Sequence, residues 1–226
     1  MRIQFFVFLV VMFGLGIVLL FFAYTNIYLP SQALNDQENR RRYEEKYLLP
    51  WVNETRKALA SGRTSKLSIY ESSSTDSLMK HFEGAPHVKK LVIQFTDISN
   101  VGVRIVSQLP NLEELIVYGN TGFDNECLAL LKKNPNLVSL RLLNVSVDDD
   151  GLSVLADFPG LSKLSLYQNS MRRTLSDSAA GKLKLLTNLT ELNIGGGWMS
   201  EEVLSKLQES LPNCKVAKSS DPIDGW

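Results

Sequence analysis

Hydrophobic and polar positions recur with a period of about 24 residues along most of the chain. Six hexapeptides share the order apolar-x-x-Leu-x-apolar, except that a Thr opens the first. They begin at Thr64, Val88, Leu112, Leu137, Leu161 and Leu189, so their starts are 24, 24, 25, 24 and 28 residues apart. Such alternation predicts a short strand with one buried face in each unit. A seventh copy begins near Cys214 and then loses the pattern, because Ser219 stands where an apolar residue is expected.

Between the predicted strands, apolar residues spaced three apart predict short helices with one buried stripe. The clearest example runs from Gly102 to Leu109, and a matching segment runs from Gly151 to Phe158. A residue whose side-chain oxygen can accept hydrogen bonds from the first helical N–H groups stands before each helix. These N-cap candidates are Thr75, Ser99, Asp124, Asp148, Ser176 or Asp177, and Ser200.

Each unit is therefore predicted to be a strand, a turn and a capped helix, which buries its apolar face only by stacking on its neighbours. The segments Leu112–Asn120 and Leu161–Asn169 both follow the order L-x-x-L-x-apolar-x-x-N. This pattern resembles the leucine-rich repeat family, in its form with 24–28-residue units and convex helices (ribonuclease-inhibitor-like), and in particular its small bacterial membrane-anchored members. The resemblance implies an α/β fold, a short solenoid with a parallel concave sheet. In two units Val145 and Gly197 stand at the Asn position of the pattern, so the row of asparagines that binds backbone groups in this family is in doubt there.

The stretch from Ile3 to Tyr24 contains no charged residue and only Gln4 as a polar one. A helix of about 20 residues spans the hydrocarbon core of a bilayer, so this stretch predicts a single transmembrane helix within an anchor at residues 1–26. A cleaved signal peptide is the alternative, although the apolar run is longer than usual for one. Arg2 precedes the run and the next basic residues are Arg40–Arg42, which favours a folded domain outside the cytoplasm.

The rest of the chain divides into three predicted parts. Residues 27–63 form a linker and an N-terminal cap helix, with Pro50 suited to its first turn and Gly62 to its end. Residues 64–218 form the repeat domain, which we expect to be monomeric, and 219–226 form a tail. Arg40–Arg42 are either solvated or in contact with lipid head groups.

Candidate chemistry other than binding is weak in this sequence. The stretch NIGGGWMSEEV, Asn193–Val203, has Ser200 where a dinucleotide fingerprint needs its third glycine, so its glycines are predicted to relax a bend. Asp148–Asp150 are predicted to favour a helix start through their negative charge, not to bind Ca²⁺. Cys127 and Cys214 should lie roughly 19 Å apart, too far for a disulfide. A net charge of zero argues against nucleic acid. We expect no catalytic residues, cofactor or metal.

Function is expected on the concave face, where strand residues alternate away from the leucine core. This face would present tyrosines and exposed aliphatic side chains in its middle and charges along one border. The four-residue insertion in the unit from Leu161 adds a loop with two arginines beside it. The predicted partner-binding residues are Tyr70, Gln94, Ile116, Tyr118, Arg141, Leu143, Tyr167, Met171, Arg172 and Arg173.

These positions predict a membrane-anchored, non-enzymatic module that binds a protein or peptide, since apolar centres rich in Tyr and Arg are typical of protein interfaces. The resemblance implies the same face, because members of the family bind ligands there. The alternative is a structural or assembly factor that acts through its membrane helix and its convex helices.

Overall fold

A computed structural model describes residues 8–13, 16–21, 44–70, 72, 75–171 and 173–219. The chain divides into two compact units, Met1–Val52 and Asn53–Trp226. The predictions for Arg40–Arg42, Arg172 and residues 220–226 concern positions outside the described residues.

The first unit contains two antiparallel strands, β1 (Phe8–Phe13) and β2 (Gly16–Phe21), and a π-helical segment, η1 (Glu44–Leu48). The prediction of a helix over 3–24 is therefore wrong for residues 8–13 and 16–21. Both segments are rich in Val, Ile and Phe, residues with high strand propensity, which hydropathy alone does not register. Among the described residues, no helix combines the length and apolar character that crossing a bilayer requires.

Helix α2 (Leu49–Ala60) contains the boundary between the units. It begins one residue before Pro50, and Gly62 follows its end with φ 71°, as the sequence predicts for a helix start and stop. Within the second unit, Leu59 of this helix is buried.

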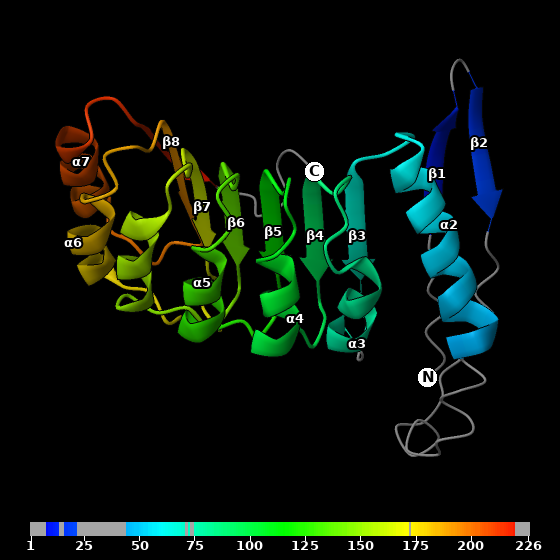
Figure 1. The fold of residues 1–226 in the computed structure, drawn as a ribbon. Helices are drawn as coiled ribbons and strands as arrows, with labels where there is room; N and C mark the ends of the chain where they lie inside the picture. Colours follow the sequence, from blue (N-terminus) through cyan, green and yellow to red (C-terminus); the bar gives the residue numbers. More distant parts are fainter. Residues whose placement is uncertain are drawn as a thin grey trace, which may run out of the picture. The chain divides into compact units, whose positions relative to one another are not determined.

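The second unit is built on a parallel sheet of seven strands in chain order (Figure 1). Each strand pairs position for position with the next, so Leu91, Leu115 and Leu140 form one buried row. The strands are β3 (Lys66–Tyr70), β4 (Lys90–Gln94), β5 (Glu114–Tyr118), β6 (Ser139–Leu143), β7 (Lys163–Tyr167), β8 (Glu191–Gly195) and β9 (Lys215–Ser219). The repeating strands predicted from the sequence are confirmed.

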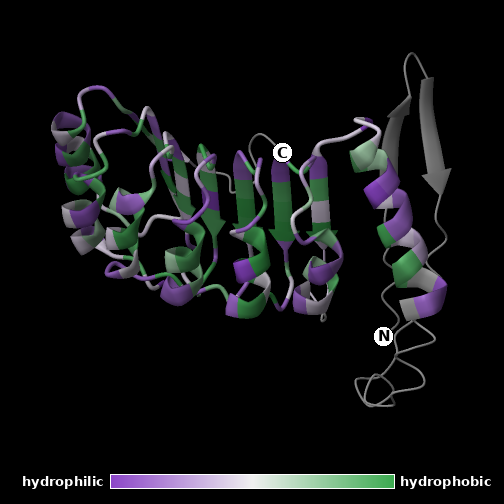
Figure 2. Ribbon diagram, in the orientation of Figure 1, coloured by the Kyte–Doolittle hydropathy of each residue, from purple (hydrophilic) through white to green (hydrophobic). Residues whose placement is uncertain are grey.

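Short helices connect the strands and lie on one face of the sheet, as Figure 1 shows. The apolar strand residues and the inward sides of these helices form the core. Figure 2 shows hydrophobic residues along the middle of most strands and mixed hydropathy along the helices. We call the opposite side of the sheet the helix-free face. The helices are α3 (Thr75–Met79), η2 (Lys80–Phe82), α4 (Asn100–Val106), α5 (Asn125–Leu131), η3 (Gly151–Asp157), η4 (Asp177–Ala179), α6 (Ala180–Leu183) and α7 (Glu201–Ser210).

Buried amides hold the backbone where two strands end. Asn120 is fully buried; its Oδ1 accepts from the N–H and hydroxyl of Thr96, and its Nδ2 donates to the carbonyls of Ile93 and Tyr118. In the unit from Leu161 the corresponding role falls to Gln168, not to Asn169. The Gln168 amide is buried, donates to the carbonyls of Val145 and Val147, and accepts from the following loop.

Carboxylates at the helix starts bind the next unit along the chain. Asp76 accepts from the N–H and hydroxyl of Ser99, and Asp177 accepts from the N–H and hydroxyl of Ser200. Asp149 does the same for Ser176. Neighbouring units are thus joined by side chains on the helical side as well as by the sheet, a connection that the capping pattern did not predict.

The last strand, β9, follows the sheet register but not the core pattern. Lys218 pairs with Ile194, so the exposed Lys218, one residue before the predicted Ser219, stands at the missing apolar position. The register predicted for this copy is therefore wrong by one residue. A short strand that lacks one of its two inward apolar residues does not define its own register.

Candidate functional site

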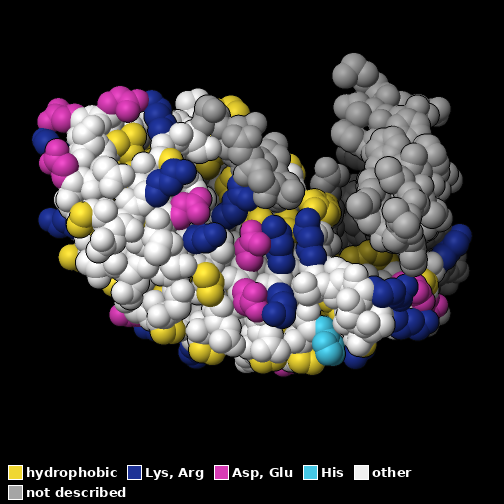
Figure 3. Space-filling model, turned by 90° about the horizontal axis from the view of Figure 1, so that it is seen from above, with side chains coloured by type: hydrophobic (Ala, Val, Ile, Leu, Met, Phe, Trp, Pro, Cys, Tyr) yellow, Lys and Arg dark blue, Asp and Glu magenta, His cyan; other side chains and the backbone are white. Residues whose placement is uncertain are grey.

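The helix-free face consists of the three strand positions that alternate with the core leucines. Its first row, at the strand starts, is charged: Lys90 pairs with Glu114 at 3.1 Å and Lys163 with Glu191 at 3.9 Å. Just before the strands, Lys89 pairs with Glu113 at 2.7 Å. Figure 3 shows basic and acidic side chains next to one another across the middle of this unit. The predicted charged border is confirmed, and its strand-start row contains four lysines and two glutamates.

Aromatic rings occupy the opposite border, where the strands end. Tyr70 is 51% exposed, while Tyr118 and Tyr167 are half-buried. In the sheet register Leu143 stands between Tyr118 and Tyr167, so these two tyrosines lie two strands, or roughly 10 Å, apart. Gln94 lies beside Tyr118 in the same row and is half-buried. The predicted tyrosine row is present.

Two glycines set the positions of rings in this row. A Cβ on Gly119 would lie 2.3 Å from the Phe95 ring, and one on Gly195 would lie 2.6 Å from the Tyr167 ring. Each ring therefore lies directly over a backbone that has no side chain. The Phe95 ring also packs against Tyr118, with centroids 4.7 Å apart and planes inclined by 47°.

Sequence reasoning missed Phe95 as part of this surface. It follows β4, has a positive φ of 51°, and is 49% exposed. A positive φ is unfavourable for a bulky residue and persists only where the surroundings hold it. The signal available in the sequence was the pair Phe95 and Gly119, one repeat apart, but no pattern links a ring to a glycine on the next strand.

The aliphatic side chains of this face are buried, which corrects the prediction that they are exposed. Ile116 and Val92 have 0% exposure and Leu143 has 2%. Together they form a small cluster, separate from the leucine core, against which Tyr118 and Tyr167 pack. We call these three residues the buried apolar cluster. Aliphatic side chains on an open sheet lower the free energy by leaving water, so burial is their expected state wherever atoms of the chain can cover them.

Arg141 lies in the same row as Ile116, on the next strand, and is half-buried. It already takes part in a noncovalent interaction within the chain. Asn193 lies two strands further along the same row, and its side-chain amide donates a hydrogen bond to Glu191 at 2.8 Å. The face therefore combines an apolar centre with one embedded positive charge.

The insertion loop contains the last three predicted contact residues, Met171, Arg172 and Arg173. Met171 is 87% exposed. Arg173 donates from Nη2 to the Gly197 carbonyl at 3.2 Å, which ties the loop to the next unit. The side chain of Arg172 lies outside the described residues.

The glycines Gly195–Gly197 serve the backbone. A Cβ on Gly196 would lie 1.8 Å from the Gln168 carbonyl oxygen, and Gly196 has φ 85°. Only glycine fits such an approach, which agrees with the predicted role at a bend. Trp198 is buried after this turn.

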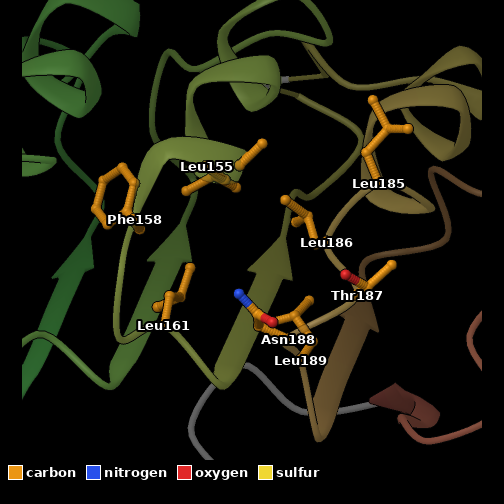
Figure 4. A pocket seen from close by; sticks show the side chains of 9 residues that line it. Leu155, Phe158, Leu161, Leu185, Leu186, Thr187, Asn188 and Leu189 are labelled. Carbon is orange, nitrogen blue, oxygen red and sulfur yellow. The ribbon is translucent and has the colours of Figure 1, made fainter.

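The described residues offer little to a small ligand or a metal. One pocket, lined by Leu155, Phe158, Leu186 and their neighbours, has a volume of about 30 Å³, well below the 300–1,000 Å³ roughly typical of small-molecule sites (Figure 4). No group of His, Cys, Asp and Glu with metal-binding spacing occurs in the described part of the chain. Cys127 and Cys214 are free and buried, as predicted. Burial raises the pKa of the Cys127 thiol to about 11, so it is a poor nucleophile.

Seven parallel strands in chain order, helices on one face and a buried amide ladder define a leucine-rich-repeat-like α/β solenoid. No protein-family model and no curated protein matches the sequence. Among solved structures, actin-binding site 2 of leiomodin-1 has a TM-score of 0.46 and 13% identity, over 60% of this chain and 86% of that one.

Two bacterial structures are also similar. A leucine-rich repeat protein of Leptospira interrogans has a TM-score of 0.34 and 20% identity, over 57% of this chain and 38% of that one. An internalin from Listeria monocytogenes has a TM-score of 0.34 and 16% identity, over 64% of this chain and 53% of that one. This chain thus spans about half or less of either protein.

Proposed function

We propose that the protein is a non-enzymatic module that binds a protein or peptide on its helix-free face. The observation that carries the proposal is the row of aromatic rings at the strand ends, formed by Tyr70, Phe95, Tyr118 and Tyr167. Aromatic side chains combine a large contact area with few rotatable bonds, so they contribute strongly to protein interfaces. Solenoids of this class commonly bind proteins on an extended surface.

The contact surface would centre on Tyr118 and Tyr167, with Arg141 between their strands. Tyr118 and Tyr167 present both an apolar ring and a hydroxyl, and glycines on the neighbouring strands leave room for the Phe95 and Tyr167 rings. Because these rings already have fixed positions, little conformational entropy is lost when a partner binds. Gln94, Met171 and Arg173 would lie at the margin.

The test is selection of displayed peptides on the purified protein, followed by measurement of binding to variants. Tyr118→Ala combined with Tyr167→Ala should weaken binding of the selected peptides by about 1,000-fold, since two hot-spot residues at about 2 kcal/mol each contribute about 4 kcal/mol. Leu185→Ala is the matched control, because Leu185 is 59% exposed and follows α6 on the helical side. Equal affinity for the tyrosine variant and the control would refute the proposal. Loss of binding only with Leu185→Ala would favour the helical side.

We further propose that the uncharged stretch from Ile3 to Tyr24 attaches the chain to a membrane, with the folded unit outside the cytoplasm. The support is its composition alone, since transfer of about 20 apolar side chains into a bilayer is strongly favourable. The full chain should stay with lipid vesicles through flotation in alkaline carbonate. Replacement of Val10, Leu19 and Leu20 by Asp should release it, and recovery of the unaltered chain in the lipid-free fraction would contradict the attachment.

A further inference from the structure

The tyrosine positions of the aromatic row repeat at every second strand. Tyr70, Tyr118 and Tyr167 are the last residues of β3, β5 and β7. The sheet register places them in one row, with Gln94 and Leu143 on the strands between them. Because neighbouring strands lie about 4.8 Å apart, the tyrosine positions follow one another at roughly 9.6 Å. A regular peptide that contacts all three in the same way must repeat at nearly this distance.

Of the regular peptide conformations, the polyproline II helix fits this repeat most closely. It has three residues per turn and rises about 3.1 Å per residue, so its side chains return to the same side after about 9.3 Å. Over the two steps of the tyrosine row, its mismatch is about 0.6 Å. An α-helix returns after two turns, about 10.8 Å, and would be about 2.4 Å out of step. An extended strand returns after about 6.8 Å and does not match the row.

The backbone of the sheet offers few partners to a peptide that crosses it. Strands β4 to β8 each pair with a neighbour on both sides, so their N–H and C=O groups are already bonded along the sheet. A crossing peptide must therefore satisfy its own backbone through side chains and water. Proline has no N–H, and a polyproline II helix has no internal hydrogen bonds, so a proline-rich segment presents mainly carbonyl acceptors.

Side chains of the row supply donors for such carbonyls. Among the described residues, the Tyr70 and Tyr167 hydroxyls and the Gln94 amide form no hydrogen bond. Tyr70 is 51% exposed, and the other two side chains are half-buried, so each is accessible from solvent. Hydroxyl and amide groups both donate to carbonyl oxygens. The first, second and fifth strands of the sheet thus each provide a donor at the aromatic border.

The row ends beside a positive charge. Arg173 donates from Nη2 to the carbonyl of Gly197, which follows β8, the strand next to that of Tyr167. The Arg173 side chain is exposed, and within the described part of the chain no carboxylate pairs with it. A guanidinium has further N–H groups that can bind a carboxylate. An acidic residue at one end of a bound segment would therefore complement this charge.

We propose that the partner of the helix-free face is a proline-rich segment in the polyproline II conformation, which crosses the strands along the aromatic row. Its acidic end would lie beside Arg173, and every third residue would contact a tyrosine ring. Aromatic surfaces bind such segments well, because the helix is formed before binding and loses little entropy. This assignment rests on the proposed function, since it names the partner of the same face.

The test compares two displayed peptide libraries on the purified full-length chain. One library has the framework xPPxPPxPPx and the other the framework xAAxAAxAAx, where x is any residue. We expect binders from the proline framework only, with apolar residues at successive x positions and Asp or Glu at one end. The alanine framework keeps the spacing along the sequence but favours an α-helix.

Variants then locate the best proline-framework peptide on the face. Gln94→Leu and Tyr167→Phe each remove a donor and keep the bulk of the side chain, so each should weaken binding about fivefold. Arg173→Glu should change the selected end residue from acidic to basic. Lys66→Gln is the matched control, because Lys66 begins the strand that Tyr70 ends and lies about 13 Å from the row. It should leave the affinity unchanged.

Three results would overturn the assignment. They are equal recovery from the two libraries, unchanged affinity for both Gln94→Leu and Tyr167→Phe, and a loss with Lys66→Gln, which would place the peptide along a strand. Failure of both libraries would also overturn it if unrestricted peptides still bind through Tyr118 and Tyr167. That last outcome leaves the proposed function intact, whereas the proposed function fails when no selected peptide depends on the two tyrosines.

Discussion

Single buried amides close the backbone where strands end. Asn120 could be predicted from the repeat pattern, because its position is fixed relative to the strand leucines, and the structure confirms its ladder bonds. Gln168 could not, because the pattern assigns that task to Asn169, one residue later. From the preceding position, the longer Gln side chain donates to two later carbonyls of the previous unit, those of Val145 and Val147. The packing of the Phe95 ring over Gly119 could not be predicted either, because this contact follows from the three-dimensional structure and not from the repeat spacing.

Replacing the ladder amide should be costly. Asn120→Ala should lower the free energy of unfolding by about 2–4 kcal/mol, because the Thr96 N–H and the Ile93 carbonyl lose their hydrogen bonds to the buried amide. The measurement is urea denaturation followed by circular dichroism. Asn188→Ala, at an exposed position before β8, serves as the control and should change stability by less than about 0.5 kcal/mol. An equal decrease in the free energy of unfolding for Asn120→Ala and Asn188→Ala would show that the buried Asn120 amide does not stabilise the fold.

At the scale of elements, the repeat strands and their helices follow from apolar spacing, since each is held by the same leucine positions in successive units. The helix predicted over 3–24, which is wrong for residues 8–13 and 16–21, has the opposite origin. An unbroken apolar run has no period, so it does not distinguish a helix from strands. The hydrogen bonds that join a carboxylate at one helix start to a serine at the next could not be predicted from the sequence either. Capping chemistry identifies Ser99 and Asp124 as caps, but it does not show which residue of the preceding unit accepts their own N–H groups.

These helix starts should respond to acid. Asp148 accepts from the Gly151 N–H at 3.0 Å and from Asn125 at 2.8 Å, and these bonds hold its pKa below the usual 3.8. A lowered folded-state pKa contributes stability above the unfolded value, and this contribution is lost as pH falls from about 3.8 through the folded pKa. Asp148→Asn should therefore make stability less dependent on pH below 4. The measurement is the urea midpoint between pH 2 and 6.

Asp150→Asn is the matched control for this effect, because Asp150 is an exposed carboxylate in the same acidic run. It should leave the acid dependence close to that of the unaltered chain. A steep dependence retained by Asp148→Asn would contradict the role assigned to these bonds.

At the scale of the whole molecule, sheet register is constant although unit length is not. Successive strands pair position for position across steps of 24, 25 and 28 residues, and the extra residues of the longest unit lie between Asn169 and Thr174. The solenoid could be predicted because its repeats share one register. The covered centre of its helix-free face could not, because strand alternation predicts direction but not what lies above a side chain.

Because the sheet register is kept despite the longer unit, the loop at Met171 is a suitable attachment site for a reporter group. Its side chain is almost wholly in solvent, while Gln168 and Thr174 secure both flanks to the preceding unit. A fluorescent dye or an epitope attached there would extend from the unit of Tyr167 without displacing a strand. A reporter at this loop would allow binding of a partner to the helix-free face to be followed by fluorescence.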